Sequence, residues 1–311
     1  MRRNESGGLA GAHASSQLDD GDLGAQNATT NTPYELRTTN YALAMKIATW
    51  NINSVRLRID SVRRFLKEAA PDVLCLQEIK CRDDQFPAFD FAATGYKHQA
   101  ISGQKGYHGV AIVSRLPLAD VEKRNFAGRE DSRHIAATIA GIRLHNFYVP
   151  AGGDEPNPDL NAKFAHKLDF MRDLGRWSAG GAAEKQKVAL VGDLNIAPRE
   201  HDVWSHKQLL DVVSHTPVET GLMNEAIAAG SWTDVARALI PEPEKVYTWW
   251  SYRAHDWRVS NRGRRLDHVW VSRALKRAAL GKGREAFAVH DRCRGWEKPS
   301  DHVPVTLALA L

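Results

Sequence analysis

Short apolar runs alternate with amphipathic segments from Lys46 to the C-terminus. Each run is short enough for a single buried strand and is rich in Val, Ile, Leu or Ala, and Gly, Pro, Asn or Asp stands beside most of them. The runs predict strands over 46–50, 73–77, 109–114, 134–140, 142–149, 188–192, 268–272 and 305–309.

Two longer segments, 58–69 and 159–177, repeat apolar residues every three or four positions. This is the spacing of a helix that buries one face. The apolar positions are Val62, Phe65 and Leu66 in the first segment and Phe164, Leu168, Met171 and Leu174 in the second. There is neither an internal repeat nor a linker after Met45, so the pattern predicts one domain, 45–311, built as a two-sheet sandwich with outer helices.

Residues 1–44 show neither the helical nor the strand spacing of apolar residues and are rich in Gly, Ala, Ser, Asn and Thr. We therefore expect them to be disordered. They lack the apolar stretch of a secretory signal and the arginine-rich character of a transit peptide. Met45-Lys46-Ile47 looks like the start of the family described below, which suggests that translation begins at Met45. An intact-mass measurement on the native protein tests this hypothesis.

Hydrophobic residues make up 43% of the 311 positions, enough for a sizeable core. No stretch approaches the roughly 18 to 20 apolar residues of a membrane span, so we expect no membrane contact. Cys75 and Cys81 lack the paired spacing and the histidine partners of a zinc site. We expect reduced thiols in a cytoplasmic protein, with Cys75 in the core.

The net charge of +5 is unevenly placed. Residues 1–44 hold three arginines against five acidic residues, a net of −2, which leaves +7 on the remainder. A basic folded body suits an anionic polymer, because neutralising phosphates releases condensed counterions. Many basic proteins bind no nucleic acid, so charge alone does not decide the partner.

Segments with a shared chemistry follow or end the apolar runs. They are Trp50-Asn51-Ile52-Asn53, Leu76-Gln77-Glu78, Asn146-Phe147-Tyr148-Val149-Pro150, Gly192-Asp193-Leu194-Asn195, Arg265-Leu266-Asp267-His268 and Ser300-Asp301-His302-Val303-Pro304. Together they supply carboxylate, amide, phenol and imidazole groups, which a hard metal ion and phosphodiester hydrolysis both require. One metal-assisted hydrolytic site is therefore predicted.

The order of these segments resembles that of the exodeoxyribonuclease III family of DNA-repair nucleases, within the endonuclease/exonuclease/phosphatase superfamily, from Met45 to Leu311. Connecting segments match as well, among them Pro71-Asp72-Val73, Gly103-Gln104-Lys105-Gly106, Gly109-Val110-Ala111 and Glu297-Lys298-Pro299. The resemblance implies an α/β fold, a four-layer sandwich of two mixed β-sheets flanked by helices. It also implies a Mg²⁺-dependent enzyme, with Mn²⁺ able to substitute. Such an enzyme digests duplex DNA 3′-to-5′ and cuts 5′ to abasic sites, leaving a 3′-hydroxyl and a 5′-phosphate.

Glu78 follows the apolar run 73–76, where a charge is costly unless it finds a cation or hydrogen-bond partners. On spacing alone, a magnesium ligand and a salt bridge to Lys80 are both open. The resemblance implies the metal, with Asn51 supplying a neutral oxygen and Asp301 lying beside the ion. The residues expected at the metal centre are Asn51, Glu78, Asp193, Asn195, Asp301 and His302.

Asp193 and Asn195 lie two residues apart after an apolar run, so an extended chain would point both side chains the same way. Gly192 before them permits a close backbone approach or an unusual dihedral angle. An Asx turn that caps the strand fits the same residues. By resemblance, Asp193 handles a proton or orients the nucleophile, and Asn195 hydrogen-bonds a phosphate oxygen.

An isolated Asp-His pair such as Asp301-His302 is usually an exposed loop. A histidine that acts near neutral pH needs a carboxylate to fix its tautomer, and the resemblance assigns Asp267 to His302. It also aims the Tyr148 hydroxyl at the scissile phosphate, whereas a tyrosine at a strand end otherwise points its hydroxyl to water. The expected catalytic residues are Tyr148, Asp193, Asn195, Asp267 and His302, with either His302 or Asp193 as the general base.

Aromatic residues and arginines interleave from Tyr247 to Arg265. Such a surface stacks on sugars or bases and neutralises phosphates, although the tryptophans can instead fill the core beneath a solvated face of arginines. We expect either Trp249 or Trp250 in the core, and the resemblance assigns Trp249 to a pocket for a flipped abasic sugar. The expected DNA contacts are Lys105, Tyr107, Trp249, Arg253, Arg262, Arg265 and Leu266.

The chain departs from the family pattern in two places. After Pro150 it has Ala151-Gly152-Gly153-Asp154, where relatives often place an amide that reaches a phosphate and sometimes an arginine. Arg264 stands where an apolar residue beside the pocket is common. The contacts with duplex DNA and the balance between abasic-site cleavage and 3′-to-5′ digestion are therefore open.

Two other classes of protein are alternatives to the nuclease. A phosphomonoesterase or phospholipase of the same superfamily would act on a small phosphoester, and the basic, tryptophan-rich stretch favours DNA over it. A catalytically dead nucleic-acid-binding module would lack a catalytic residue, and every expected one is present. We expect a monomeric, nucleoid-associated nuclease that acts on double-stranded DNA with abasic sites or 3′ ends.

Overall fold

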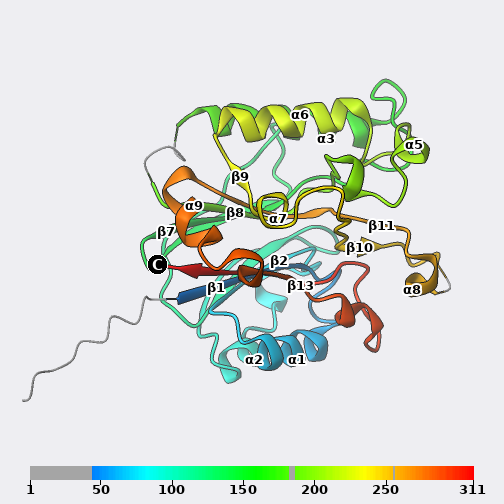
Figure 1. The fold of residues 1–311 in the computed structure, drawn as a ribbon. Helices are drawn as coiled ribbons and strands as arrows, with labels where there is room; N and C mark the ends of the chain where they lie inside the picture. The colour runs from blue at the N-terminus through cyan, green and yellow to red at the C-terminus, as the bar shows by residue number, and fades with distance from the viewer. Residues whose placement is uncertain (1–43, 182–185, 255) are drawn as a thin grey trace, which may run out of the picture. The chain divides into compact units, whose positions relative to one another are not determined.

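The computed structural model describes residues 44–181, 186–254 and 256–311, and two mixed six-stranded sheets run through it (Figure 1). The first sheet has the order β13 (Phe287–Val289), β14 (Val305–Ala310), β1 (Ala44–Asn51), β2 (Val73–Gln77), β4 (Val110–Ser114) and β3 (His98–Ser102). The second has the order β5 (Ala119–Glu122), β6 (His134–Ile139), β7 (Ile142–Tyr148), β8 (Val188–Asp193), β12 (Asp267–Val271) and β9 (Thr233–Asp234). All eight predicted strands are present, each within two residues of its expected ends.

Helices cover the outer faces of both sheets, as the opposite placement of two helix pairs in Figure 1 shows. On the first sheet lie α1 (Ile59–Ala69) and α2 (Ala88–Ala93), and on the second lie α3 (Ala162–Ala179) and α6 (Pro217–Ala229). The remaining helices are α5 (His206–Leu209), α7 (Val235–Leu239), α8 (Trp257–Ser260) and α9 (Arg273–Leu280), with 3₁₀ turns at Asp83–Gln85, Glu200–Asp202, Gly283–Ala286 and Asp291–Gly295. The predicted four-layer α/β sandwich is confirmed.

The three largest hydrophobic clusters hold the layers together. In β2, Val73 and Cys75 point into the cluster between the two sheets, while Leu74 and Leu76 point into the cluster beneath α1. A strand that is covered on both faces consists of one unbroken apolar run. This is why β2 lacks the alternation of apolar and polar residues that a half-exposed strand shows. The prediction that Cys75 lies in the core is confirmed.

The two predicted helices are confirmed as α1 and α3, and α6 is an element that apolar spacing missed. Its N-terminus nevertheless has a sequence signature. Pro217 is the first helical residue, and Thr216 and Glu219 form a reciprocal capping box. The capping residues therefore predict this helix better than its mixed apolar pattern does.

Disorder was predicted for residues 1–44, of which 1–43 lie outside the described residues. The prediction is wrong for Ala44, which belongs to β1. Within the described part of the chain, no helix is both long and apolar enough to cross a membrane.

The strand directions bring the predicted motifs to one edge. β1 pairs with β2 in parallel, as β7 does with β8, so the carboxyl ends of each pair finish together. β12 runs antiparallel to β8 and β14 antiparallel to β1, so both begin where their partners end. In register, Asp193 lies opposite both Tyr148 and Asp267. We call this end of the sandwich the catalytic edge.

Gly192 has a φ of +141°, and a Cβ atom added there would lie 1.9 Å from the carbonyl oxygen of Phe147. We expect Gly192→Ala to lower the free energy of unfolding by about 3 kcal/mol, because the neighbouring strand must move. Gly175 in α3 is the matched control, since a Cβ there meets nothing within 4 Å. Gly175→Ala should raise stability by about 0.5 to 1 kcal/mol. Urea unfolding compares the two variants, and equal midpoints would contradict the steric argument.

Candidate functional site

Side chains from both sheets meet at the catalytic edge. They come from the ends of β1, β2, β7 and β8 and from the starts of β12 and β14, and they are Asn51, Glu78, Tyr148, Asp193, Asn195, Asp267, Asp301 and His302. All of them are buried except Glu78 and Asp301, which are half-buried.

His302 lies between two carboxylates. Its Nδ1 is 2.8 Å from Oδ2 of Asp267, and its Nε2 is 3.7 Å from Oδ2 of Asp193. Burial opposes a charged imidazole, but Asp267 and Asp193 outweigh it and raise the pKa of His302 well above its usual value. One ligand atom from each of the three residues lies within 4.8 Å of the others, so the group could hold a metal ion.

Asp193 is fully buried, and burial raises its pKa, with the Asp267 carboxylate adding to the effect and His302 opposing it. Its Oδ1 accepts a hydrogen bond from the backbone N–H of Asn195, which is the Asx turn that the sequence left open. Its Oδ2 accepts from the side-chain amides of both Asn51 and Asn195. The second amide hydrogen of Asn195 goes to the carbonyl of Val149 at 2.9 Å.

Glu78, like Asp193, is a carboxylate at which several hydrogen bonds of the catalytic edge converge. Its Oε1 accepts hydrogen bonds from the Tyr148 hydroxyl at 2.7 Å and the Asn51 amide at 3.0 Å, and its Oε2 lies 2.8 Å from the Lys80 ammonium. Burial raises the pKa of Glu78, but Lys80 and these hydrogen bonds outweigh it, so the net shift is downward. The salt bridge to Lys80 is therefore present. The Asn51 amide nitrogen also lies 2.8 Å from Asp193, so Asn51 joins the two centres.

The amide oxygen of Asn51 accepts from the backbone N–H of Asn53, so the amide N–H groups face the carboxylates. Asn53 reaches across the edge as well, since its side-chain amide donates to Oδ1 of Asp301 at 3.0 Å. Asn53 and Glu78 both have positive φ angles, of 47° and 50°. Non-glycine residues in this region concentrate at functional sites. Sequence reasoning gave Asn53 no role, and its place beside Asn51 was the available signal.

Trp249 binds the second carboxylate oxygen of Asp301. Its indole N–H donates to Oδ2 of Asp301 at 2.9 Å, and the Arg264 guanidinium stacks 5.3 Å from its ring. Trp249 lies on the ribbon β10 (Trp249–Trp250), which pairs with β11 (Gly263–Arg264). Trp250 is buried, so the expectation that one tryptophan fills the core is confirmed.

The predicted DNA contacts fall into two sets. Lys105, Tyr107, Arg253 and Arg262 are exposed, whereas Leu266 is buried against Trp249. Arg265 is fully buried, with its guanidinium 2.7 Å from Asp202 and 2.8 Å from Asp234. The prediction that Arg265 contacts DNA is wrong, because an arginine enclosed by two carboxylates presents no surface to a phosphate.

Lys167 binds two loops of the catalytic edge, a role that sequence reasoning missed. The side chain is fully buried, and its ammonium is paired with Glu219. It donates to the carbonyls of Asn195 at 2.8 Å and Ala151 at 3.2 Å, which lie in the loops after β8 and β7. The position next to the apolar stripe of α3 offered no signal that this lysine points inward.

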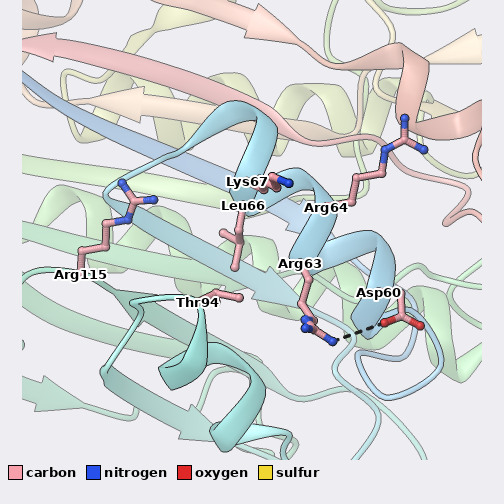
Figure 2. Close-up of a pocket in the computed structure, with 7 residues that line it drawn as sticks. All are labelled: Asp60, Arg63, Arg64, Leu66, Lys67, Thr94 and Arg115. Carbon is pink, nitrogen blue, oxygen red and sulfur yellow. Dashed lines mark ion pairs between the residues drawn. The ribbon is translucent and has the colours of Figure 1, made fainter.

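Two cavities differ in their relation to the edge. One of about 510 Å³ lies beside Tyr148. Another, of about 620 Å³, lies at α1, and none of the predicted site residues line it (Figure 2). Figure 2 shows Arg63 pointing toward Asp60, with Arg64 and Arg115 on opposite sides of the cavity. Its arginines are exposed surface groups.

Known proteins match this chain over most of its length. Residues 48–302 match the family model described as Endonuclease/Exonuclease/phosphatase family. The chain is 29% identical to Exodeoxyribonuclease III of Haemophilus influenzae, over 84% of this chain and 98% of that protein. It is 30% identical to the DNA repair nuclease APEX1 of Danio rerio, over 87% of this chain and 84% of that protein.

Solved structures agree in fold. An AP endonuclease from Archaeoglobus fulgidus is 32% identical with a TM-score of 0.78, and the 3′ phosphatase NExo from Neisseria, bound to a product DNA hairpin, is 34% identical with a TM-score of 0.77. Each alignment covers 86% of this chain and 100% of the other. This chain therefore belongs to the endonuclease/exonuclease/phosphatase family and, within it, to the exodeoxyribonuclease III group of nucleases.

Proposed function

We propose that residues 45–311 form the catalytic domain of a Mg²⁺-dependent DNA-repair nuclease. It digests duplex DNA 3′-to-5′ and cuts 5′ to abasic sites, leaving a 3′-hydroxyl and a 5′-phosphate. The observation that carries this proposal is the catalytic edge, where His302 stands between Asp267 and Asp193 and an amide links them to Glu78. Relatives named as a DNA repair nuclease and an AP endonuclease support the same chemistry.

The half-buried Glu78 and Asp301 carboxylates fit a hard divalent cation, since such an ion prefers oxygen ligands. We assign Mg²⁺, or Mn²⁺ in its place, to Glu78 and Asp301 with Asn51 beside them. When bound, the ion offsets the negative charge that builds on the phosphate. The other residues expected at the metal centre lie next to this ligand set: Asp193 accepts from the Asn51 amide, and Asn195 and His302 both contact Asp193.

Asp193 accepts the proton of the attacking water. Burial raises the pKa of its carboxyl, which makes the carboxylate a stronger base, and the amides of Asn51 and Asn195 fix its orientation. His302 remains protonated between Asp267 and Asp193 and stabilises the charge on the phosphate. Tyr148 and Asn195 turn toward phosphate oxygens when DNA is bound.

DNA lies across the edge, where exposed cations and aromatic rings flank it. Lys105, Tyr107, Arg253 and Arg262 contact the backbone, and Trp249 with Leu266 lines the pocket for the abasic sugar. We further propose that the enzyme is a monomer and acts in the cytoplasm at the nucleoid.

An end-labelled duplex with one synthetic abasic site tests the function. With Mg²⁺ we expect incision 5′ to the lesion and shortening of 3′ ends, and EDTA should abolish both. An undamaged duplex separates the two activities, and a small phosphomonoester serves as the rival substrate. Release of phosphate from that ester with both duplexes intact would replace the nuclease by the phosphomonoesterase.

A further inference from the structure

Two histidines outside the catalytic edge lie against each other. His206 is the first residue of α5, and His215 lies in the loop just before α6. Nδ1 of His206 is 2.8 Å from Nε2 of His215, and the two rings are nearly perpendicular, with an interplanar angle of 82°. One proton shared between the two nitrogens satisfies this contact, so both imidazoles are neutral in it.

The backbone orients the His215 ring. His215 is only 2% exposed, and its Nδ1 lies 2.6 Å from the carbonyl oxygen of Ala197. Nδ1 therefore carries the proton and donates it to this carbonyl, which leaves the lone pair of Nε2 facing His206. Burial lowers the pKa of His215, so the ring is neutral near pH 7. A histidine that binds a metal ion usually has this arrangement, with its second nitrogen donating to a carbonyl or carboxylate.

The distance between the two nitrogens fits a single metal ion between them. Zn²⁺ holds imidazole nitrogens at about 2.0 to 2.1 Å, which places two tetrahedral ligands roughly 3.3 Å apart. The pair must therefore open by roughly 0.5 Å. His206 is exposed and free to make this movement, and the proton on its Nδ1 moves to its other nitrogen when the ion binds.

The chemistry of the pair selects the kind of ion. No third histidine, cysteine or carboxylate of the described chain offers a ligand atom within 4.8 Å of both nitrogens, so water fills the remaining positions. Imidazole nitrogen suits Zn²⁺, Cu²⁺ and Ni²⁺, whereas Mg²⁺ prefers oxygen. The pair is therefore suited to a different metal from the carboxylates of the catalytic edge.

The pair also lies next to residues that contact Trp249. Ser214 precedes His215, and its hydroxyl accepts a hydrogen bond at 2.6 Å from Arg264, the residue that stacks on Trp249. The carbonyl of Ser214 accepts from the N–H of Ala197 at 2.8 Å. An ion on His215 therefore fixes α5 to the loop after β8 and to the segment that positions Arg264.

We propose that His206 and His215 bind one Zn²⁺ ion at a site separate from the catalytic edge. Cu²⁺ serves as the spectroscopic probe, because nitrogen hyperfine splitting in electron paramagnetic resonance counts the imidazoles on the ion. Protein without a histidine tag receives Cu²⁺ in the absence of Mg²⁺. For the unaltered protein we expect a signal from two nitrogen ligands, which His206→Ala should lose. In competition with a chromophoric chelator, His206→Ala should bind Zn²⁺ at this site at least about tenfold more weakly.

His201→Ala is the matched control, because His201 lies in the same part of the chain and its Nδ1 is held by Glu242 at 2.9 Å. It should keep the two-nitrogen signal and the Zn²⁺ affinity. His302→Ala should keep them as well, since it removes only the imidazole of the catalytic edge. Melting temperatures measured without metal establish that each variant folds.

The proposal is overturned if the unaltered protein shows no two-nitrogen signal, which would leave a hydrogen-bonded histidine pair only. It is overturned equally if His206→Ala keeps the signal and the Zn²⁺ affinity. Neither measurement uses DNA or cleavage, so the zinc site stands or falls independently of the proposed nuclease function.

Discussion

Asp193→Asn is expected to lower kcat for incision at an abasic site by about 1000-fold, with little change in KM. The amide cannot accept the proton of the attacking water, and it no longer balances the charge of His302, whose Nε2 lies 3.7 Å away. The variant should also lose about 1 to 3 kcal/mol of stability. The reason is that the new amide turns an N–H toward either the Asn51 and Asn195 amides or the Asn195 backbone N–H.

Single-turnover incision of the abasic duplex measures this effect, with Asp211→Asn as the control. Asp211 is exposed and belongs to no part of the edge, so its variant should keep full activity. An Asp193→Asn enzyme within tenfold of the unaltered one would show that Asp193 is not the base. His302 would then take that role.

Arg265→Met is expected to lower the free energy of unfolding by about 3 to 5 kcal/mol, because it removes the buried cation that Asp202 and Asp234 share. Arg265 lies between Asp202 and Asp234. Arg265 and Asp202 are fully buried, so water cannot replace the lost ion pair at Asp202, and the Asp234 side chain is only 13% exposed. Arg237 still reaches Asp202, so Asp234 suffers the larger loss.

Arg262→Met is the matched control for this substitution. Arg262 is exposed and stacks 4.7 Å from the Trp204 ring, so its loss should cost less than about 0.5 kcal/mol of stability. DNA affinity should show the reverse order when measured below both melting temperatures: Arg262→Met binds more weakly, and Arg265→Met binds normally. A stable Arg265→Met variant with weakened binding would restore Arg265 as a DNA contact.

Arg265 also shows where sequence reasoning failed. An arginine among aromatic residues in a basic stretch has the composition of a DNA-binding surface, and Arg262 and Arg265 look alike in that respect. Their difference comes from Asp202 and Asp234, which precede Arg265 by 63 and 31 residues. Only the folded chain brings these carboxylates to one of the two arginines.

Glu78 shows a different limit of prediction from sequence. Metal ligand and salt bridge stood as alternatives in the sequence, yet the structure contains the Lys80 pair together with the Asn51 and Tyr148 hydrogen bonds. The two functions are compatible because a carboxylate has two oxygens and about four acceptor sites. The Lys80 pair therefore does not exclude Glu78 as a metal ligand, which stays a prediction.

The sequence by itself determined the eight strands, the two long helices and the chemical groups of the edge, because apolar periodicity and side-chain chemistry are local properties. The tertiary structure decided the other contacts of the edge. The pairing of His302 with Asp267 was expected from the family resemblance, whereas the link from Asn51 to Asp193, which spans 142 residues across two sheets, was not expected. Contacts of this kind follow from strand order and register, which side-chain burial fixes only after the sheets have packed.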